Sequence, residues 1–306
     1  MRLGSGSHSF ELVENWAKLP GGVTLGYTHG VVIDSKDRVY VHNRSKDSVV
    51  VFERDGTFVK SWGPDFAAGA HGMYLSNEGG TEYLYLADPE RHLVVKTTTD
   101  GKVIYTLGVP DLPNVYKTPD LYKPTDTAVA PNGDVYVCDG YGQSWIHVYD
   151  KTGKWIRSWG GKGVEAGKLS CPHGVWIDTR KSTPRVYVAD RGNNRIQIFS
   201  LIGEPLGVVT YDLRLPCCFY QYGSEQYIPD LHSRVTIFDE HDRLITHLGD
   251  EPGAWTKAGW PNVAKEERRP GRFISPHACC VDSKGDVYVV EWISDGRVTK
   301  LARVAQ

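Results

Sequence analysis

The stretch from His29 to Gly63 reads HGVVIDSKDRVYVHNRSKDSVVVFERDGTFVKSWG, and it decides the architecture of the chain. Short segments of alternating apolar and polar residues, such as Val39-Tyr-Val41, are separated by polar turns, such as Asp55-Gly56. Period-two alternation is typical of half-buried β-strands, and Asp-Gly is a frequent hairpin turn. The stretch therefore predicts one antiparallel sheet of about four strands.

The same pattern returns along the whole chain. Further copies start at His71, Thr125, His173, Cys217 and His277. Six copies of a four-stranded unit predict an all-β fold, a six-bladed β-propeller, in a single domain of residues 1–306. The expected blades cover approximately residues 29–64, 71–108, 124–160, 173–209, 216–249 and 277–304.

The last copy ends after its third strand. Residues 10–16 (FELVENW) resemble the fourth strands at Phe58–Trp62 and Trp155–Trp159. We therefore expect residues 9–16 to complete the last blade and close the ring, because this removes an exposed strand edge. Long connections are expected at residues 109–123, 161–172 and 250–276.

Composition excludes several classes of protein. With 35 Lys and Arg against 37 Asp and Glu, the chain lacks the basic surface that nucleic-acid binding needs. No apolar run approaches the roughly 18–20 residues of a membrane span, and residues 1–10 lack the apolar core of a signal peptide. Six cysteines are too few to build a disulfide framework, so we expect thiols and a cytoplasmic location.

Histidines are concentrated where the innermost strands begin. Four of the six copies start with His, although the chain has only 11 His in total. His71, His173 and His277 belong to alternate blades, at separations of 102 and 104 residues. Three imidazoles around an axis, with one open position, are the geometry of a catalytic zinc site. We predict these three as metal ligands, although a histidine at a strand start can also simply bond to a neighbouring carbonyl.

Two further residues are expected near the same axis. His29 breaks the alternation and is a candidate for a fourth ligand, a supporting group or a substrate contact. Cys217 is a candidate soft ligand. The expected cofactor is a divalent metal ion, zinc in the first place, with non-haem iron as the alternative for a histidine-rich site.

The turn after the second strand of each copy lies near the same strand starts. An acidic or amide residue opens each of these turns, where turn capping and hydrogen bonding between blades explain it. Arg44, Tyr141 and Arg191 follow such residues and are not typical turn formers. Beside a metal ion, the two arginines would bind an anion and the tyrosine would transfer a proton.

These stretches carry a closer resemblance. Val137–Tyr141 (VCDGY), Pro172-His173 and Val188–Arg191 (VADR) resemble the signature of peptidyl-α-hydroxyglycine α-amidating lyase, an NHL-repeat propeller. The resemblance implies a metal-dependent lyase for a small α-hydroxy substrate bound in the central channel. It also implies roles for single residues, namely metal binding by His71, His173 and His277, and catalysis by Tyr141, Arg44 and Arg191.

The chain departs from that family at some positions. Ala278 stands where the family has an acidic residue that helps to hold a structural calcium ion, so a calcium ion is doubtful here. Other interpretations remain open at this point: a metal-dependent hydrolase or lactonase, a non-haem iron enzyme, or a non-catalytic NHL scaffold for a ligand or a protein. We expect a small-molecule partner and neither nucleic acid nor membrane; the sequence leaves the oligomeric state open.

Overall fold

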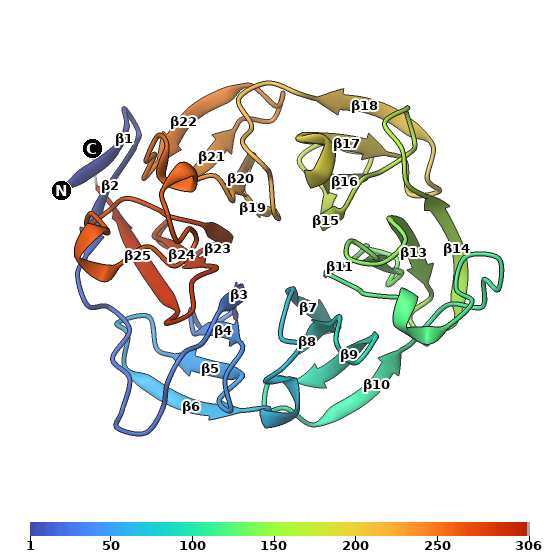
Figure 1. Ribbon diagram of the computed structural model, residues 1–306, viewed down its shortest axis with the longest axis horizontal. Coiled ribbons are helices and arrows are strands. Elements are labelled where there is room, and N and C mark those ends of the chain that lie inside the picture. Colours follow the sequence, from blue (N-terminus) through green and yellow to red (C-terminus); the bar gives the residue numbers. More distant parts are fainter. Residues whose placement is uncertain (305–306) are drawn as a thin grey trace. The chain divides into compact units, whose positions relative to one another are not determined.

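The computed structural model describes residues 1–304 and confirms an all-β, six-bladed propeller (Figure 1). The chain divides into two compact units. The first unit holds Met1–Ala67 and the chain from Asp212 onward, and the second holds Ala68–Tyr211. No helix among the described residues is long and apolar enough to cross a membrane.

The first unit contains three antiparallel sheets. One is β3 (Thr28–Ile33), β4 (Val39–Asn43), β5 (Val49–Phe52) and β6 (Phe58–Trp62). Another is β19 (Tyr220–Tyr222), β20 (Glu225–Asp230), β21 (Arg234–Phe238) and β22 (Leu244–Leu248). The third runs in the order β1 (Arg2–Ser5), β2 (His8–Val13), β25 (Arg297–Arg303), β24 (Val287–Glu291) and β23 (Pro276–Val281).

The second unit also contains three sheets, each of four strands in sequence order. They are β7 (Met73–Glu78), β8 (Thr81–Asp88), β9 (Leu93–Thr98) and β10 (Val103–Leu107); β11 (Asp126–Val129), β12 (Val135–Cys138), β13 (Trp145–Tyr149) and β14 (Trp155–Gly160); and β15 (Pro172–Asp178), β16 (Arg185–Asp190), β17 (Arg195–Phe199) and β18 (Pro205–Val209).

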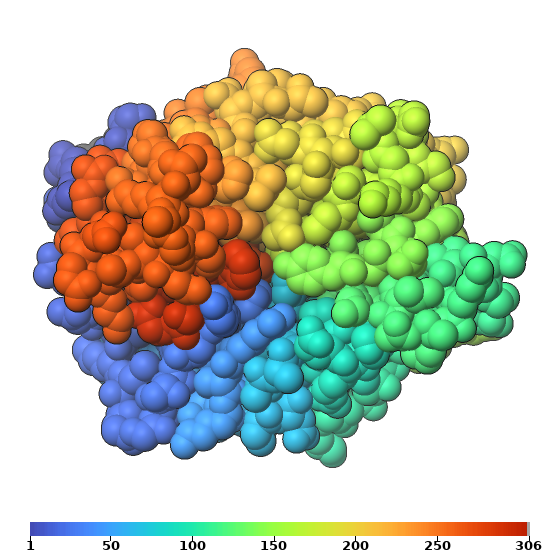
Figure 2. All heavy atoms as spheres, viewed as in Figure 1, coloured from blue at the N-terminus to red at the C-terminus, as the bar shows by residue number. Residues whose placement is uncertain are grey.

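The described helices are single 3₁₀ turns in the connections. They are η1 (Pro64–Phe66), η2 (Pro119–Leu121), η3 (Arg191–Asn193), η4 (Ala254–Thr256) and η5 (Lys265–Glu267). The connection at residues 250–276, which carries η4 and η5, lies on the surface (orange in Figure 2).

Apolar residues on both faces of the middle strands form the core. In β4 every residue is buried, whereas β6 at the outside of the same sheet has partly exposed residues throughout. Tyr136 of β12 packs in one cluster with Val175 of the neighbouring sheet, and Val31 packs with Tyr288 in another. Each such valine contributes about 1.5–3 kcal/mol by leaving water, so packing between sheets holds each unit together.

The N-terminal strand completes the last blade, as the sequence predicted. β2 pairs with β25, with Phe10 opposite Arg303, and the Phe10 ring is fully buried. Beyond the strand, Trp16 is buried against the rings of Phe52 and Tyr288, at 5.2 and 5.0 Å between centroids. A feature that the sequence analysis did not predict is β1, which folds back on β2 and makes this sheet five-stranded.

Three innermost strands carry an irregularity at the same place. The pairing register skips one residue between Thr28 and Gly30 in β3, between Pro172 and Gly174 in β15, and between Pro276 and Ala278 in β23. The skipped residues are His29, His173 and His277. A β-bulge leaves one residue out of the ladder and re-aims its side chain, so the strand starts themselves turn these imidazoles away from the regular pleat.

The six cysteines are thiols and form no disulfides. Burial raises the pKa of both Cys279 and Cys280 well above the usual value of a thiol. Such thiols pack as small apolar groups. The thiol state agrees with the sequence analysis; the cytoplasmic location stays a prediction.

Candidate active site

A repeated backbone hydrogen bond sets the position of the predicted catalytic residues. In five copies of the repeat, the first or second residue after the acidic or amide residue at the end of the second strand donates its N–H to a backbone carbonyl. The accepting carbonyl belongs to the residue two positions before the start of the copy. The bonds are Arg44 to Tyr27 (2.9 Å), Tyr141 to Lys123 (3.3 Å), Arg191 to Cys171 (3.2 Å), Leu231 to Leu215 (3.0 Å) and Trp292 to Ser275 (2.9 Å). The side chain at this position is therefore held beside the start of its own blade's innermost strand.

The acidic or amide residue one or two positions before this residue has a structural role. It is fully buried and accepts a hydrogen bond from the backbone of the incoming connection. The acceptor and donor pairs are Asn43 with Gly26 (2.9 Å), Asp139 with Lys123 (2.7 Å), Asp190 with Ser170 (2.7 Å), Asp230 with Arg214 (2.8 Å) and Glu291 with Ile274 (2.7 Å). The capping interpretation of these residues holds, so they are not candidates for catalysis.

In the second unit, four predicted site residues come together at the Tyr141 hydroxyl. This oxygen lies 3.1 Å from Nε2 of His71 and 3.1 Å from Nε2 of His173. Nη2 of Arg191 lies 3.4 Å from the same oxygen, and the guanidinium carbon lies 5.5 Å from the centre of the tyrosine ring. Tyr141 is 40% exposed, whereas the two imidazoles are buried. The Tyr141 hydroxyl thus lies between two buried imidazoles and solvent, within hydrogen-bond distance of the Arg191 guanidinium.

Gly140 allows Tyr141 to reach this position. A Cβ at Gly140 would lie 2.4 Å from the carbonyl oxygen of Pro172 and 2.5 Å from Oγ1 of Thr125. No real Cβ tolerates backbone oxygen at that distance, so only glycine fits between the two innermost strands. The order of residues 139–141 therefore has a steric reason. Asp139 caps the turn, Gly140 passes close to the neighbouring strand, and Tyr141 carries the hydroxyl.

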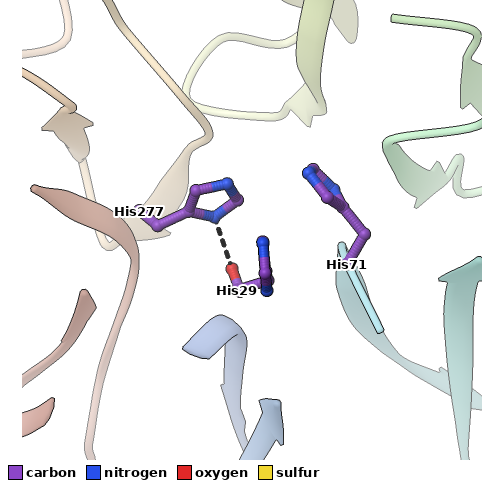
Figure 3. Close-up of side chains that lie close together, drawn as sticks. All are labelled: His29, His71 and His277. Atoms are coloured by element: carbon purple, nitrogen blue, oxygen red, sulfur yellow. Dashed lines mark hydrogen bonds between the residues drawn. The ribbon is translucent and has the colours of Figure 1, made fainter. Parts of the chain in front are cut away.

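Backbone carbonyls orient two of the predicted metal ligands. His71 donates Nδ1–H to the carbonyl of Thr125 (2.6 Å), and His277 donates Nδ1–H to the carbonyl of His29 (2.7 Å; dashed line in Figure 3). Because a carbonyl only accepts, the proton of the neutral ring is on Nδ1 and the lone pair is on Nε2. Metal-binding histidines are typically held in this way, so the rings fit a divalent ion bound through Nε2.

The first unit places the remaining predicted residues near one another. The rings of His29 and His277 meet edge to face at 4.8 Å, and both are buried. The Tyr27 carbonyl accepts from the Arg44 backbone N–H and lies 3.1 Å from Nδ1 of His29, so Arg44 and His29 share an anchor. Cys217 is fully buried at the start of its blade. The half-buried Arg44 is thus placed by its backbone.

One supporting network was missed by the sequence analysis. The Tyr116 hydroxyl donates to Asp139 (2.6 Å) and accepts from Nε2 of His147 (2.7 Å), and Nδ1 of His147 accepts from Ser158 (2.7 Å). Burial lowers the pKa of His147 to about 3, so the ring is neutral, as this directed chain requires. Burial also raises the pKa of Asp139 to about 6, against the hydrogen bonds it accepts. This series of hydrogen bonds ties the 109–123 connection to Asp139, the capping residue before Tyr141.

The chain is similar to known propeller proteins. Residues 126–244 match a family model described as a 6-bladed beta-propeller. NHL repeat-containing protein 3 of Mus musculus is 31% identical over 296 residues, which is 92% of this chain and 81% of that protein. The probable peptidyl-alpha-hydroxyglycine alpha-amidating lyase pgal-1 of Caenorhabditis elegans is 28% identical over 169 residues, 54% of this chain and 46% of that protein.

Among solved structures, a gluconolactonase from Xanthomonas campestris superimposes with a TM-score of 0.64. The match covers 91% of this chain and 86% of the other, at 14% sequence identity. At this identity the likeness shows the fold alone.

Proposed function

Because the chain belongs to the family of NHL repeat-containing proteins and is distantly related to the amidating lyases, we propose that it is a metal-dependent lyase. Its substrate would be a small N-acyl-α-hydroxyglycine, and its products an amide and glyoxylate. The observation that carries the proposal is the Tyr141 hydroxyl, which lies against Nε2 of two buried imidazoles and beside the Arg191 guanidinium.

We assign His71, His173 and His277 as ligands of one divalent ion, zinc in the first place and iron as the alternative. The Nδ1 bonds of His71 and His277 to backbone carbonyls support this assignment, since they leave Nε2 as the basic atom. When bound, such an ion acts as a Lewis acid that makes a neighbouring hydroxyl more acidic. His29 and Cys217 are assigned supporting positions beside these ligands.

Tyr141, as a phenolate, would take the proton from the substrate's α-hydroxyl and become a neutral phenol. The electron pair of that O–H bond forms the C=O bond of glyoxylate, and the bond between the α-carbon and the amide nitrogen breaks. The leaving nitrogen receives the proton back from Tyr141, so no oxidant or added water is consumed. Arg191 and Arg44 would bind the substrate carboxylate, because guanidinium groups match its two oxygens.

A direct turnover experiment tests the proposal. Purified protein loaded with Zn²⁺ is incubated with N-acetyl-α-hydroxyglycine, and proton NMR follows acetamide and glyoxylate. We expect both products in equal amounts, at a rate that rises with protein concentration. N-acetylglycine, which lacks the hydroxyl, is the control and should stay intact. If zinc-loaded and iron-loaded protein both leave the hydroxylated substrate at its spontaneous rate, the lyase assignment is wrong.

A further inference from the structure

The first unit contains a cluster of hydrogen-bonded reactive side chains that the lyase chemistry does not use, at the turn between β1 and β2. The Ser7 hydroxyl oxygen lies 3.1 Å from Nδ1 of His8, and Nε2 of His8 lies 2.7 Å from Oε1 of Glu225. All three residues belong to this one compact unit. A nucleophile, a base and an acidic group that orients the base, bonded in this order, are the arrangement of serine hydrolases.

The carboxylate of Glu225 fixes the direction of these hydrogen bonds. Because a carboxylate only accepts, the proton of the neutral His8 ring is on Nε2 and the lone pair is on Nδ1. The Ser7 hydroxyl then donates to Nδ1, which is the direction that a general base needs in order to take the proton. The two ring nitrogens have exchanged places relative to the serine protease arrangement, whereas the order of the hydrogen bonds is the same.

Burial fixes the base and leaves the nucleophile accessible. His8 is only 7% exposed, whereas Ser7 is exposed. The Glu225 side chain is mostly buried, and its Oε2 accepts a hydrogen bond from the Tyr227 hydroxyl at 2.9 Å. The imidazole and the carboxylate are therefore held in one orientation, while a substrate can reach the Ser7 oxygen from solvent.

The turn that carries Ser7 is held on two sides. Oγ of Ser9 donates to the Gly6 carbonyl at 2.9 Å, and Nη2 of Arg303 donates to the Ser7 carbonyl at 3.2 Å. An added Cβ at Gly6 would meet no atom within 4 Å, so the approach to the turn is open. Arg303 also places a cation beside the nucleophile, where positive charge stabilises the oxyanion of a tetrahedral intermediate.

We propose that Ser7, His8 and Glu225 form a hydrolytic site of their own, which cleaves small, unhindered esters. Nδ1 of His8 takes the Ser7 proton while the Ser7 oxygen bonds to the acyl carbon, and the ester C–O bond breaks. His8 passes that proton to the leaving alcohol oxygen, which leaves Ser7 acylated. Water, deprotonated by the same nitrogen, then releases the carboxylic acid and restores the serine. Because the turn is exposed, a large acyl group has little to pack on, and acetyl esters suffice as substrates.

Covalent labelling of the zinc-loaded protein tests the site. A fluorophosphonate phosphonylates an activated serine and releases fluoride, and peptide mass spectrometry locates the label. We expect the label on Ser7, and faster hydrolysis of p-nitrophenyl acetate by the wild type than by Ser7→Ala. His8→Gln should lower the labelling rate by a factor of about 10²–10⁴, because it removes the general base. Glu225→Gln should also lower the rate, because an amide can donate to Nε2 and favour the wrong tautomer.

Ser5 provides the matched control. It is an exposed serine of the same hairpin, and its Oγ donates to Oγ1 of Thr246 in β22 at 3.3 Å instead of to an imidazole. Ser5→Ala should keep the full labelling of Ser7. The site is overturned if wild-type Ser7 is labelled no faster than Ser5, or if His8→Gln keeps the full rate. The bond between His8 and Glu225 would then only pin the hairpin to β20.

Thiols at the two serine positions give a second measurement that changes no buried residue. Ser7→Cys and Ser5→Cys are treated with iodoacetamide at pH 7, and mass spectrometry follows each peptide. We expect Ser7→Cys to react about ten times faster, because the neighbouring imidazole favours the thiolate. Equal rates would contradict the role of His8, even if the His8 and Glu225 variants do not fold. Neither measurement involves an α-hydroxyglycine, so this proposal and the lyase proposal can fail independently.

Discussion

The Tyr141 hydroxyl lies 3.1 Å from Nε2 of His173, a residue that starts the next blade along the chain. The same oxygen meets Nε2 of His71 at 3.1 Å, from the preceding blade. Since His71 keeps its proton on Nδ1, the tyrosine donates its own proton to that ring. A phenol held by three successive blades is a group whose proton can move while its oxygen stays in place.

Replacing Tyr141 by Phe removes the oxygen and keeps the ring. We expect turnover of N-acetyl-α-hydroxyglycine to fall by a factor of about 10²–10⁴, because general acid–base groups contribute that much. KM should change little. Steady-state kinetics by NMR measures both constants, and Tyr211→Phe, at a tyrosine that is 48% exposed elsewhere, is the control. Unchanged kcat in Tyr141→Phe would reject its role.

Removal of the metal ligands should empty the site. His71→Ala, His173→Ala and His277→Ala should each lose most of the bound metal, because three imidazoles hold a zinc ion far better than two. Elemental analysis of protein purified without added metal gives both the content and the identity of the ion. His241→Ala changes a histidine whose side chain is 56% exposed and should retain full occupancy. Full occupancy in all three ligand variants would contradict the assignment.

The position of Tyr141 should be sensitive to its neighbour. Gly140→Ala puts a methyl group 2.4 Å from the Pro172 carbonyl, so the turn must move. A shift of about 1 Å in a reacting group costs roughly 100-fold in rate, so kcat should fall steeply while binding of N-acetylglycine persists. At Gly207 an added Cβ lies 3.8 Å from Ile198, which makes Gly207→Ala the matched control. Equal kinetics of the two variants would show that the close approach is not needed.

Stability should depend on pH through Asp126. Burial raises the pKa of this carboxyl from 3.8 to about 7, against two backbone hydrogen bonds that lower it. The folded state therefore binds the extra proton between these values, so the stabilising contribution is complete below about pH 4 and is lost as pH rises through 7. Over that window the free energy of unfolding should fall by roughly 4 kcal/mol from this group.

Urea unfolding at several pH values isolates the effect. Asp126→Asn cannot titrate, so its stability relative to the wild type should increase from about pH 4 and level off above pH 7. Burial lowers the pKa of His147 to about 3, which gives a contribution of the opposite sign, but both proteins share it and it cancels in the difference. A difference that stays constant across the range would show that Asp126 has an ordinary pKa.

The ring closure should be a large part of the stability of the first unit. Deleting residues 1–13 removes β1 and β2, exposes the edge of β25 and opens the site of the buried Phe10 ring. The loss of that ring alone costs about 3–5 kcal/mol. Deleting residues 1–5 removes only β1, whose one buried side chain is Leu3, and should cost less. Thermal unfolding compares the two, and equal melting temperatures for the longer deletion and the full chain would contradict the prediction.

Much of the fold and part of the site follow from the repeat. Strand alternation and turn residues locate each blade, and counting from the copy at His29 finds the equivalent position of Tyr141. Arg2–Ser5 shows no alternation, so β1 could not be predicted; it exists because a hairpin brings it beside β2. The bond between Tyr116 and Asp139 depends on the path of a long connection, which local patterns do not determine. The ring contacts of Trp292 with Tyr27 and Trp260 likewise join segments that are distant in sequence.

A main-chain hydrogen bond fixes the same position in five blades, whatever side chain the residue has. The residues at this position are Arg44, Tyr141, Arg191, Leu231 and Trp292. A point mutation at one of these positions can therefore change the side chain without breaking the backbone hydrogen bond that holds it. Paralogues should diverge first at these positions, and an engineer who wishes to give this propeller a new activity can begin by exchanging these few side chains.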